Sequence, residues 1–195
     1  MDFNDDIIKR LIKETTHTEE INLNDIPCVD LYMDQVTTFF EDKLTSLKRD
    51  KEDKILTKTM INNYTKAKIL MPVKNKKYTK QHIILLTLIY NLKQTMSISD
   101  ICKIISPLLK ETDKSLKSAV KVDELYSAFL DVKKEGSINF DENLTKEIEA
   151  IKEKYAEDEL KQVLLTVLML INEANMHKRM AEKVLDNFLL KIKNL

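Results

Sequence analysis

Apolar residues recur three or four positions apart along most of this chain, the spacing that places them on one face of an α-helix. The spacing predicts helices over residues 3–12, 31–47, 57–68, 79–95, 97–110, 116–132, 141–155 and 157–193. The last of these is either one helix or two that meet near residues 172–175. A single glycine among 195 residues is too few for the turns of a many-stranded sheet. We therefore expect an all-α protein.

Several side chains predict where these helices begin and end. Thr57, Thr79 and Ser97 each precede an apolar-periodic segment, and a hydroxyl at that position can accept a hydrogen bond from the first turn. Pro72 ends the helix that Thr57 begins. Gly136 is expected to end a helix with a left-handed cap.

The segment Val163–Ile171 is apolar on nearly all sides. Such a segment is expected to be buried, either centrally in its own domain or against a partner chain. With nine residues it is too short to span a membrane, which takes about 20. The acidic start of the chain does not suit a signal peptide. We expect a soluble cytoplasmic protein without a membrane partner, in which this segment contributes to a homodimer.

The sequence contains no pattern that predicts catalysis or a metal site. It has no glycine-rich phosphate loop, no His-Glu-x-x-His helix and no nucleophile motif, so we do not expect an enzyme. Cys28 and Cys102 lie far apart and cannot build a closed zinc site. We interpret both as reduced, buried, hydrophobic side chains, and we expect neither metal nor cofactor.

Charge is distributed unevenly along a chain that is neutral overall. Residues 54–99, which we call the basic segment, contain nine lysines and no acidic residue. The rest of the chain therefore carries nine more acidic than basic side chains. Lysine runs often coat a solvated helix face, but a one-signed patch also attracts an oppositely charged partner. Nucleic acid is the most common polyanion of this kind.

Two stretches within and beside the basic segment resemble a known family. Met60-Ile-Asn-Asn-Tyr-Thr-Lys-Ala-Lys-Ile-Leu70 is similar to the recognition helix of MerR proteins, whose pattern is Thr-Ile-Arg-Tyr-Tyr-Glu-Arg-Ile-Gly-Leu-Leu. Met96-Ser-Ile-Ser-Asp-Ile101 resembles the family's Phe-Ser-Leu-Glu-Glu-Ile. Pro72, Tyr78 and Thr79 match the wing proline, the wing-ending tyrosine and the next helix cap. The wider sequence, including Leu31-Tyr-Met-Asp-Gln-Val36, is similar to an uncharacterised bacterial family built on a MerR-like module.

The resemblance implies a winged helix-turn-helix with a short wing, in which the helix after Thr57 enters the DNA major groove. Asn62 and Asn63 would then contact adenine, and lysines would contact phosphate. Lys68 occupies the position of the family's glycine, so this helix is expected to end with a different geometry. The predicted DNA-binding residues are Lys58, Thr59, Asn62, Asn63, Tyr64, Lys66, Lys68, Lys74, Lys76, Lys77, Tyr78 and Lys80.

We therefore expect three parts: an N-terminal acidic helix and connection (1–30), a MerR-like DNA-binding domain (31–110) and a helical domain for dimerisation or effector binding (111–195). The expected function is transcription regulation by sequence-specific binding of double-stranded DNA, with an unknown small-molecule or protein effector at the third part. The alternative is a protein-interaction module, in which the same basic helices dock an acidic partner without binding DNA.

Overall fold

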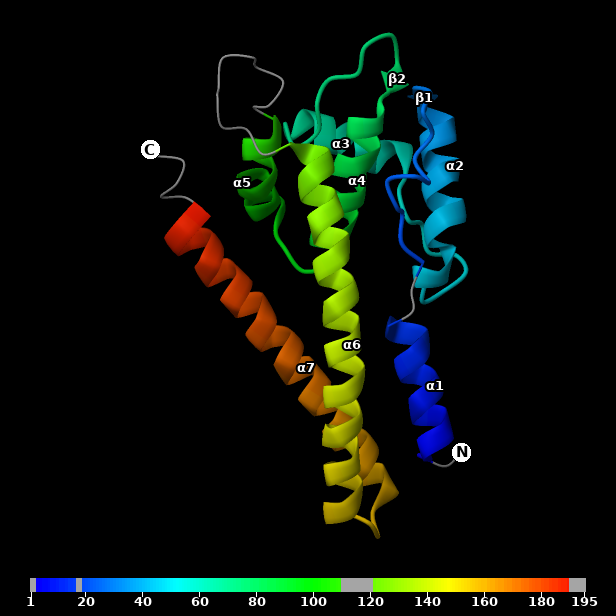
Figure 1. Ribbon diagram of the computed structural model, residues 1–195, viewed down its shortest axis with the longest axis vertical. Coiled ribbons are helices and arrows are strands. Elements are labelled where there is room, and N and C mark those ends of the chain that lie inside the picture. Colours follow the sequence, from blue (N-terminus) through cyan, green and yellow to red (C-terminus); the bar gives the residue numbers. More distant parts are fainter. Residues whose placement is uncertain (1–2, 17–18, 110–120, 190–195) are drawn as a thin grey trace. The chain divides into compact units, whose positions relative to one another are not determined.

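The computed structural model describes residues 3–16, 19–109 and 121–189, and it is mainly helical, which confirms the all-α prediction (Figure 1). The chain divides into two compact units. Unit 1 consists of Met1–Thr18 and Asp131–Lys183, and unit 2 of Glu19–Leu130 and Val184–Leu195. This division differs from the three predicted parts, because residues 19–30 belong with the segment that follows them and residues 1–18 associate with 131–183.

Unit 2 is built around a helix that is buried on all sides. Its elements are β1 (Leu31–Tyr32), α2 (Met33–Leu44), η1 (Thr45–Leu47), α3 (Lys58–Lys66), β2 (Lys77–Tyr78), α4 (Lys80–Leu92), α5 (Ile98–Leu109) and the start of α6 (Val122–Lys154). In α4, nine consecutive residues from His82 to Tyr90 are buried. The two short strands pair antiparallel, with Leu31 opposite Tyr78.

The predicted starts of three helices are confirmed. Thr57 is the N-cap of α3, and its hydroxyl accepts a hydrogen bond from the Met60 N–H at 3.2 Å. Thr79 is the N-cap of α4. The Ser97 hydroxyl accepts a bond from the Asp100 N–H at 3.1 Å, just before α5. The Thr57 and Ser97 hydroxyls therefore accept as expected, and all three residues mark where the helices of the basic segment begin.

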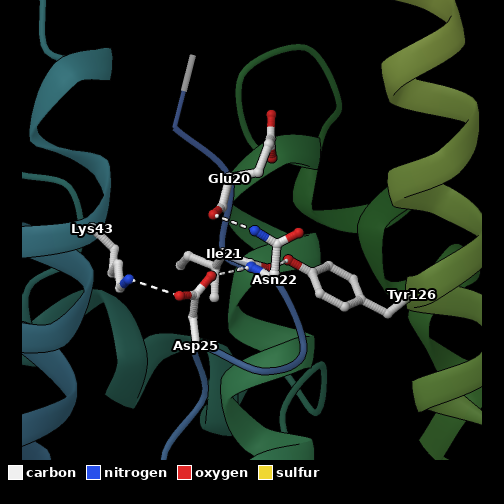
Figure 2. A network of polar contacts seen from close by, with 6 residues as sticks. All are labelled: Glu20, Ile21, Asn22, Asp25, Lys43 and Tyr126. Atoms are coloured by element: carbon white, nitrogen blue, oxygen red, sulfur yellow. Dashed lines mark hydrogen bonds and ion pairs between the residues drawn. The ribbon is translucent and has the colours of Figure 1, made fainter. Parts of the chain in front are cut away.

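A network of polar contacts holds the chain entering unit 2 against two helices (Figure 2). Tyr126 of α6 donates its hydroxyl to the Ile21 carbonyl at 2.6 Å, and its side chain is fully buried. Burial raises the pKa of Tyr126 to about 12. Asp25 accepts from the Asn22 N–H at 2.8 Å and from the Lys43 ammonium of α2 at 2.9 Å. Residues 20–25 are thus fixed from both sides.

Unit 1 is a small helical assembly made from α1 (Asp5–Thr16), most of α6 and most of α7 (Glu159–Val184). Ile8 and Ile12 of α1 pack with Leu144 and Ile148 of α6. Lys152 forms an ion pair with Asp5. The apolar contact and the ion pair together attach the N-terminal helix to α6.

One prediction about these long helices is wrong, and one open alternative is decided. Gly136 does not end a helix, because α6 continues through it from Val122 to Lys154. No glycine of the chain has positive φ. One glycine costs a helix about 1 kcal/mol relative to alanine, which the remaining residues of a 33-residue helix outweigh. The chain from Glu159 to Val184 is one helix, which continues as a π-helical turn, η3 (Leu185–Leu189). Residues 110–120, which include the start of the helix predicted over 116–132, lie outside the described residues.

The apolar segment of α7 is exposed within its own chain, so the predicted central burial is wrong, and burial against a partner chain stays a prediction. Between Leu160 and Ile171, six apolar side chains are 36% to 70% exposed. The buried residues of this helix are Gln162 and Thr166. No helix among the described residues is long and apolar enough to cross a membrane.

Candidate nucleic-acid interface

The α3 helix has one buried and one exposed side. Ile61 and Tyr64 are buried, and five residues at helical spacing are exposed. These five, which we call the outward face of α3, are Lys58, Thr59, Asn62, Asn63 and Lys66. The face carries two cations, two amides and a hydroxyl, and no acidic side chain. It therefore presents donors and acceptors that suit phosphate and base edges.

The expectation that α3 ends without the glycine geometry is wrong. Lys68 has φ 58°, so it adopts the left-handed conformation that glycine usually supplies. The Ile69 N–H bonds to the Tyr64 carbonyl at 3.0 Å, and the Lys68 N–H to the Thr65 carbonyl at 3.1 Å. These two bonds form a Schellman motif with Lys68 at its left-handed position. The helix thus ends with the usual glycine geometry, made here by a lysine whose side chain is exposed.

The non-helical stretch before α4 contains a tight hairpin, residues 74–77. Asn75 and Lys76 both have positive φ, 52° and 60°. The Lys77 N–H donates to the Lys74 carbonyl at 3.0 Å, and these two residues form an antiparallel bridge. Positive φ at both central residues is the mark of a type I′ turn. Three lysines therefore lie on one four-residue hairpin, and Lys74 and Lys76 are exposed.

The start of α2 is connected to both α3 and the hairpin. Lys58 of α3 forms an ion pair with Asp34, in the first turn of α2. The Lys77 ammonium lies 5.4 Å from the centre of the Tyr32 ring, in the strand that directly precedes α2. The pairing of β1 with β2 holds the hairpin at this place. The outward face of α3 and the hairpin therefore approach the same end of α2.

Two predicted DNA contacts are wrong. Tyr64 and Tyr78 are buried, at 6% and 4% exposure, so they pack in the core. Burial raises the pKa of each phenol. The Tyr78 ring packs edge-on against His82, with 5.5 Å between ring centres. The remaining ten predicted residues are exposed or partly exposed.

One lysine of the basic segment has a structural role. Lys93 is partly buried, and its ammonium donates to the Ile55 carbonyl at 2.9 Å and lies 4.6 Å from the centre of the Tyr90 ring. Burial lowers its pKa. Lys93 was not among the predicted DNA-binding residues, and these contacts assign it to the packing of α4 and not to the charged surface.

His82 lies in the first turn of α4, soon after β2, and its side chain contacts the residue that caps this helix. Its Nδ1 accepts a hydrogen bond from the Thr79 N–H at 3.1 Å and lies 2.8 Å from the Thr79 hydroxyl oxygen. Burial lowers the pKa of this side chain. Because Nδ1 accepts a bond, the neutral imidazole is the form that caps the helix.

Sequence reasoning missed three residues of this surface. Asn75 allows the hairpin turn, and asparagine tolerates the left-handed conformation, which is a readable signal. Tyr32 and Asp34 come to the surface through the folding of β1 and α2, and nothing in their local sequence indicates it. Asp34 also means that the surface is not free of acidic side chains.

The described residues include no group of three or more His, Cys, Asp or Glu side chains that could hold a metal ion. Cys28 is exposed, which corrects the prediction that it is buried. Cys102 is partly buried, and its thiol lies 3.5 Å from the Ala67 carbonyl, just beyond α3.

Comparison with known proteins finds one family. Residues 21–129 match the family model DUF1836, described as a domain of unknown function. The match covers more than half of the chain, and its limits lie close to those of the continuous part of unit 2, Glu19–Leu130. No curated protein and no solved structure matches the chain.

Proposed function

We propose that this chain, which belongs to the DUF1836 family, binds double-stranded DNA and regulates transcription. The observation that supports the proposal best is the outward face of α3, with its lysines and amides exposed together on one side of a short capped helix. In this proposal α3 enters the major groove, where a helix can reach base edges.

The arrangement of unit 2 favours a winged helix-turn-helix with a short wing, as the MerR resemblance implies. In this interpretation α2 and α3 are the two helices, and the hairpin at 74–77 is the wing. The hairpin fits this role because it is tied to β1 at the start of α2 and exposes cations. The connection between α2 and α3, residues 45–57, is longer than the turn of about 3–4 residues in a typical motif.

In this proposal the asparagine amides and the lysine ammonium groups of the surface have different roles. Asn62 and Asn63 can each make a bidentate contact to adenine, whereas lysine contacts phosphate and sets the position on the duplex. The lysines in this role are Lys58, Lys66, Lys68, Lys74, Lys76, Lys77 and Lys80. The basic segment contains no arginine, the residue that most often reads guanine, so we expect a preference for A·T-rich sites.

One observation favours the second candidate, a module that docks an acidic protein. Lys58 already has a carboxylate partner in Asp34, so an acidic side chain is a ligand that this surface accepts. A protein partner would be held by a few such pairs at defined places. Duplex DNA would engage the lysines along its whole backbone, and this difference can be measured.

The experiment is a salt series of binding to duplex DNA, followed by fluorescence anisotropy. Each phosphate contact adds about −0.9 to the slope of log K against log salt. The variant Lys74→Glu/Lys76→Glu should weaken binding to every duplex and flatten the slope, whereas Asn62→Ala should change which sequence binds best. The control is Lys146→Glu/Lys178→Glu, an equal charge change at two exposed lysines outside the basic segment.

Wild-type protein that does not bind any duplex at low salt would refute DNA binding and favour the acidic protein partner. Binding that both double variants reduce equally would refute the assignment of the surface, because the loss would then follow from net charge alone.

A further inference from the structure

The α7 helix carries an apolar stripe that nothing in the described chain covers. The stripe consists of Leu160, Val163, Leu164, Val167, Leu168 and Ile171, all in unit 1. Leu160 is 70% exposed and Leu168 is 63% exposed. We propose that a second copy of this chain binds to this stripe, and that the two α7 helices pack antiparallel about a two-fold axis.

The orientation of α7 within its own unit supports an external partner. Gln162 and Thr166, each 6% exposed, are the buried residues of this helix. The Gln162 amide donates to the Tyr155 carbonyl at 2.8 Å, at the end of α6, and Met169 adds an apolar contact to the cluster of α1 and α6. The helix thus contacts its own unit with a partly polar side and turns the apolar stripe outward. An amphipathic helix whose outer side faced only water would have the opposite orientation.

The spacing of the stripe favours a second copy over an unrelated protein. The six residues follow one another at intervals of three, one, three, one and three, so the pattern is the same from both ends. Under a two-fold axis near residues 165–166, Leu160 lies level with Ile171 of the second copy, Val163 with Leu168 and Leu164 with Val167. Every apolar residue then meets an apolar residue, as an isologous interface requires.

Charge is compatible with this pairing. Between Leu160 and Ile171 the only charged residue is Lys161. In the antiparallel arrangement Lys161 lies near the level of Leu170 of the second copy, so within the stripe no like charges face each other. A parallel arrangement would place the two Lys161 side chains at the same level, where they would repel.

The size of the stripe sets the expected affinity. Twelve residues of helix span about 17 Å. A contact of this length lies at the low end of the range for specific interfaces, which bury roughly 800 Å² per partner at standard size. We therefore expect a dissociation constant in the micromolar range and a dimer that dissociates on dilution.

The first test is sedimentation velocity of the full-length protein from about 1 to 200 µM. Wild-type protein should shift from monomer to dimer over this range. Val167→Glu should raise the dissociation constant at least tenfold, because it places a carboxylate beside the two-fold axis. Val29→Glu is the matched control, since Val29 is also an exposed valine (69%) but lies outside the stripe. Circular dichroism of both variants should match the wild type.

The second test determines the direction of the helices. In a Cys28→Ser/Cys102→Ser background, one preparation carries Leu160→Cys and another Ile171→Cys. Antiparallel packing predicts that the mixture forms disulfide-linked dimers under mild oxidation and that neither preparation does so alone. Equal residues would be about 17 Å apart along the helix, far beyond the reach of a disulfide.

Protein that stays monomeric at about 200 µM would overturn the proposal and leave the stripe to a different protein. Disulfide-linked dimers in each single preparation would overturn the antiparallel arrangement. Neither test involves DNA, and Val167 lies in unit 1, so this proposal can fail while DNA binding holds, and the reverse.

Discussion

Replacing Lys68 and Lys76 by glycine should make the protein more stable and weaken its binding to DNA. Both residues have left-handed backbones, with φ of 58° and 60°, and both side chains are exposed. The left-handed conformation costs an L-residue roughly 1–2 kcal/mol, and glycine adopts it without this cost. The double variant Lys68→Gly/Lys76→Gly therefore relieves strain at the end of α3 and in the hairpin.

The magnitude follows from the two sites. Glycine also makes the unfolded chain more flexible, which returns about 0.5–1 kcal/mol of the gain at each site. The net gain is then about 1–2 kcal/mol for the double variant. At 195 residues, each kcal/mol raises Tm by about 2–4 °C, so the expected increase is roughly 2–8 °C. The change Lys76→Gly also places a glycine directly after Asn75, and Asn-Gly is the dipeptide that type I′ turns prefer.

DNA affinity should change in the opposite direction. Removing two phosphate contacts lowers the salt slope by about 1.8 and the affinity at 0.1 M salt by about 60-fold. The assays are thermal unfolding by circular dichroism and the anisotropy salt series. Lys68→Gln/Lys76→Gln serves as the control, because it removes the same charges and keeps the strained backbone. It should lose the same affinity without becoming more stable.

Two results would refute this reasoning. A more stable double-glycine variant with unchanged DNA affinity and salt slope would show that neither lysine contacts phosphate. A less stable variant would show that the lysine side chains contribute more to the fold than their strained backbones cost. A gain in stability with a loss of binding is the result that separates function from folding, because a variant that is more stable cannot have lost binding by unfolding.

Three further predictions concern buried and paired groups of unit 2. Tyr126→Phe leaves the Ile21 carbonyl without its donor and should lower the free energy of unfolding in urea by about 1–3 kcal/mol. Burial raises the pKa of Tyr126 to about 12, so the stabilisation by this side chain should be present below the ordinary phenol pKa of about 10 and be lost as pH rises toward 12. Burial lowers the pKa of His82, so stability should decrease as pH falls below about 6.5, and His82→Gln, which keeps a capping acceptor but does not titrate, should remove part of this decrease. The hydrogen bond from Lys43 lowers the pKa of Asp25, so Asp25→Asn should be less stable than wild type at pH 7 by up to about 1 kcal/mol, with the difference vanishing as pH falls below about 4.

The sequence predicted the helices of unit 2 well because their signals are local. Thr57, Thr79 and Ser97 accept or cap as their positions indicated, and the apolar spacing of α4 marks a buried helix. The backbones of Lys68 and Lys76 were not predictable, because lysine has no preference for the left-handed region. Gly136 was misread because a glycine signals a helix end only where neighbouring residues do not continue the helix.

A local sequence pattern does not show which side chains the rest of the fold buries. Tyr64 and Tyr78 lie among exposed lysines in sequence, yet their rings pack in the core, since the fold around α4 decides burial. In α7 the apolar residues were recognised, but their burial inside their own domain was wrong, because a pattern gives the apolar side of a helix and not its partner. Both errors come from tertiary contacts that no window of sequence contains.

The two proposals differ in scope, and this difference follows from where the family match ends. The match at residues 21–129 includes α3 and the hairpin, so the proposed DNA binding is a property that the family's domain can have by itself. The α7 stripe begins at residue 160, outside the match, so the proposed dimerisation would depend on the additional helices of this chain. A micromolar dimer would then couple DNA affinity to protein concentration, because a duplex with two half-sites holds two copies together and favours their association. DNA contact and dimer contact would thus be separate elements, joined in this chain through the continuous helix α6, which starts in unit 2 and ends in unit 1.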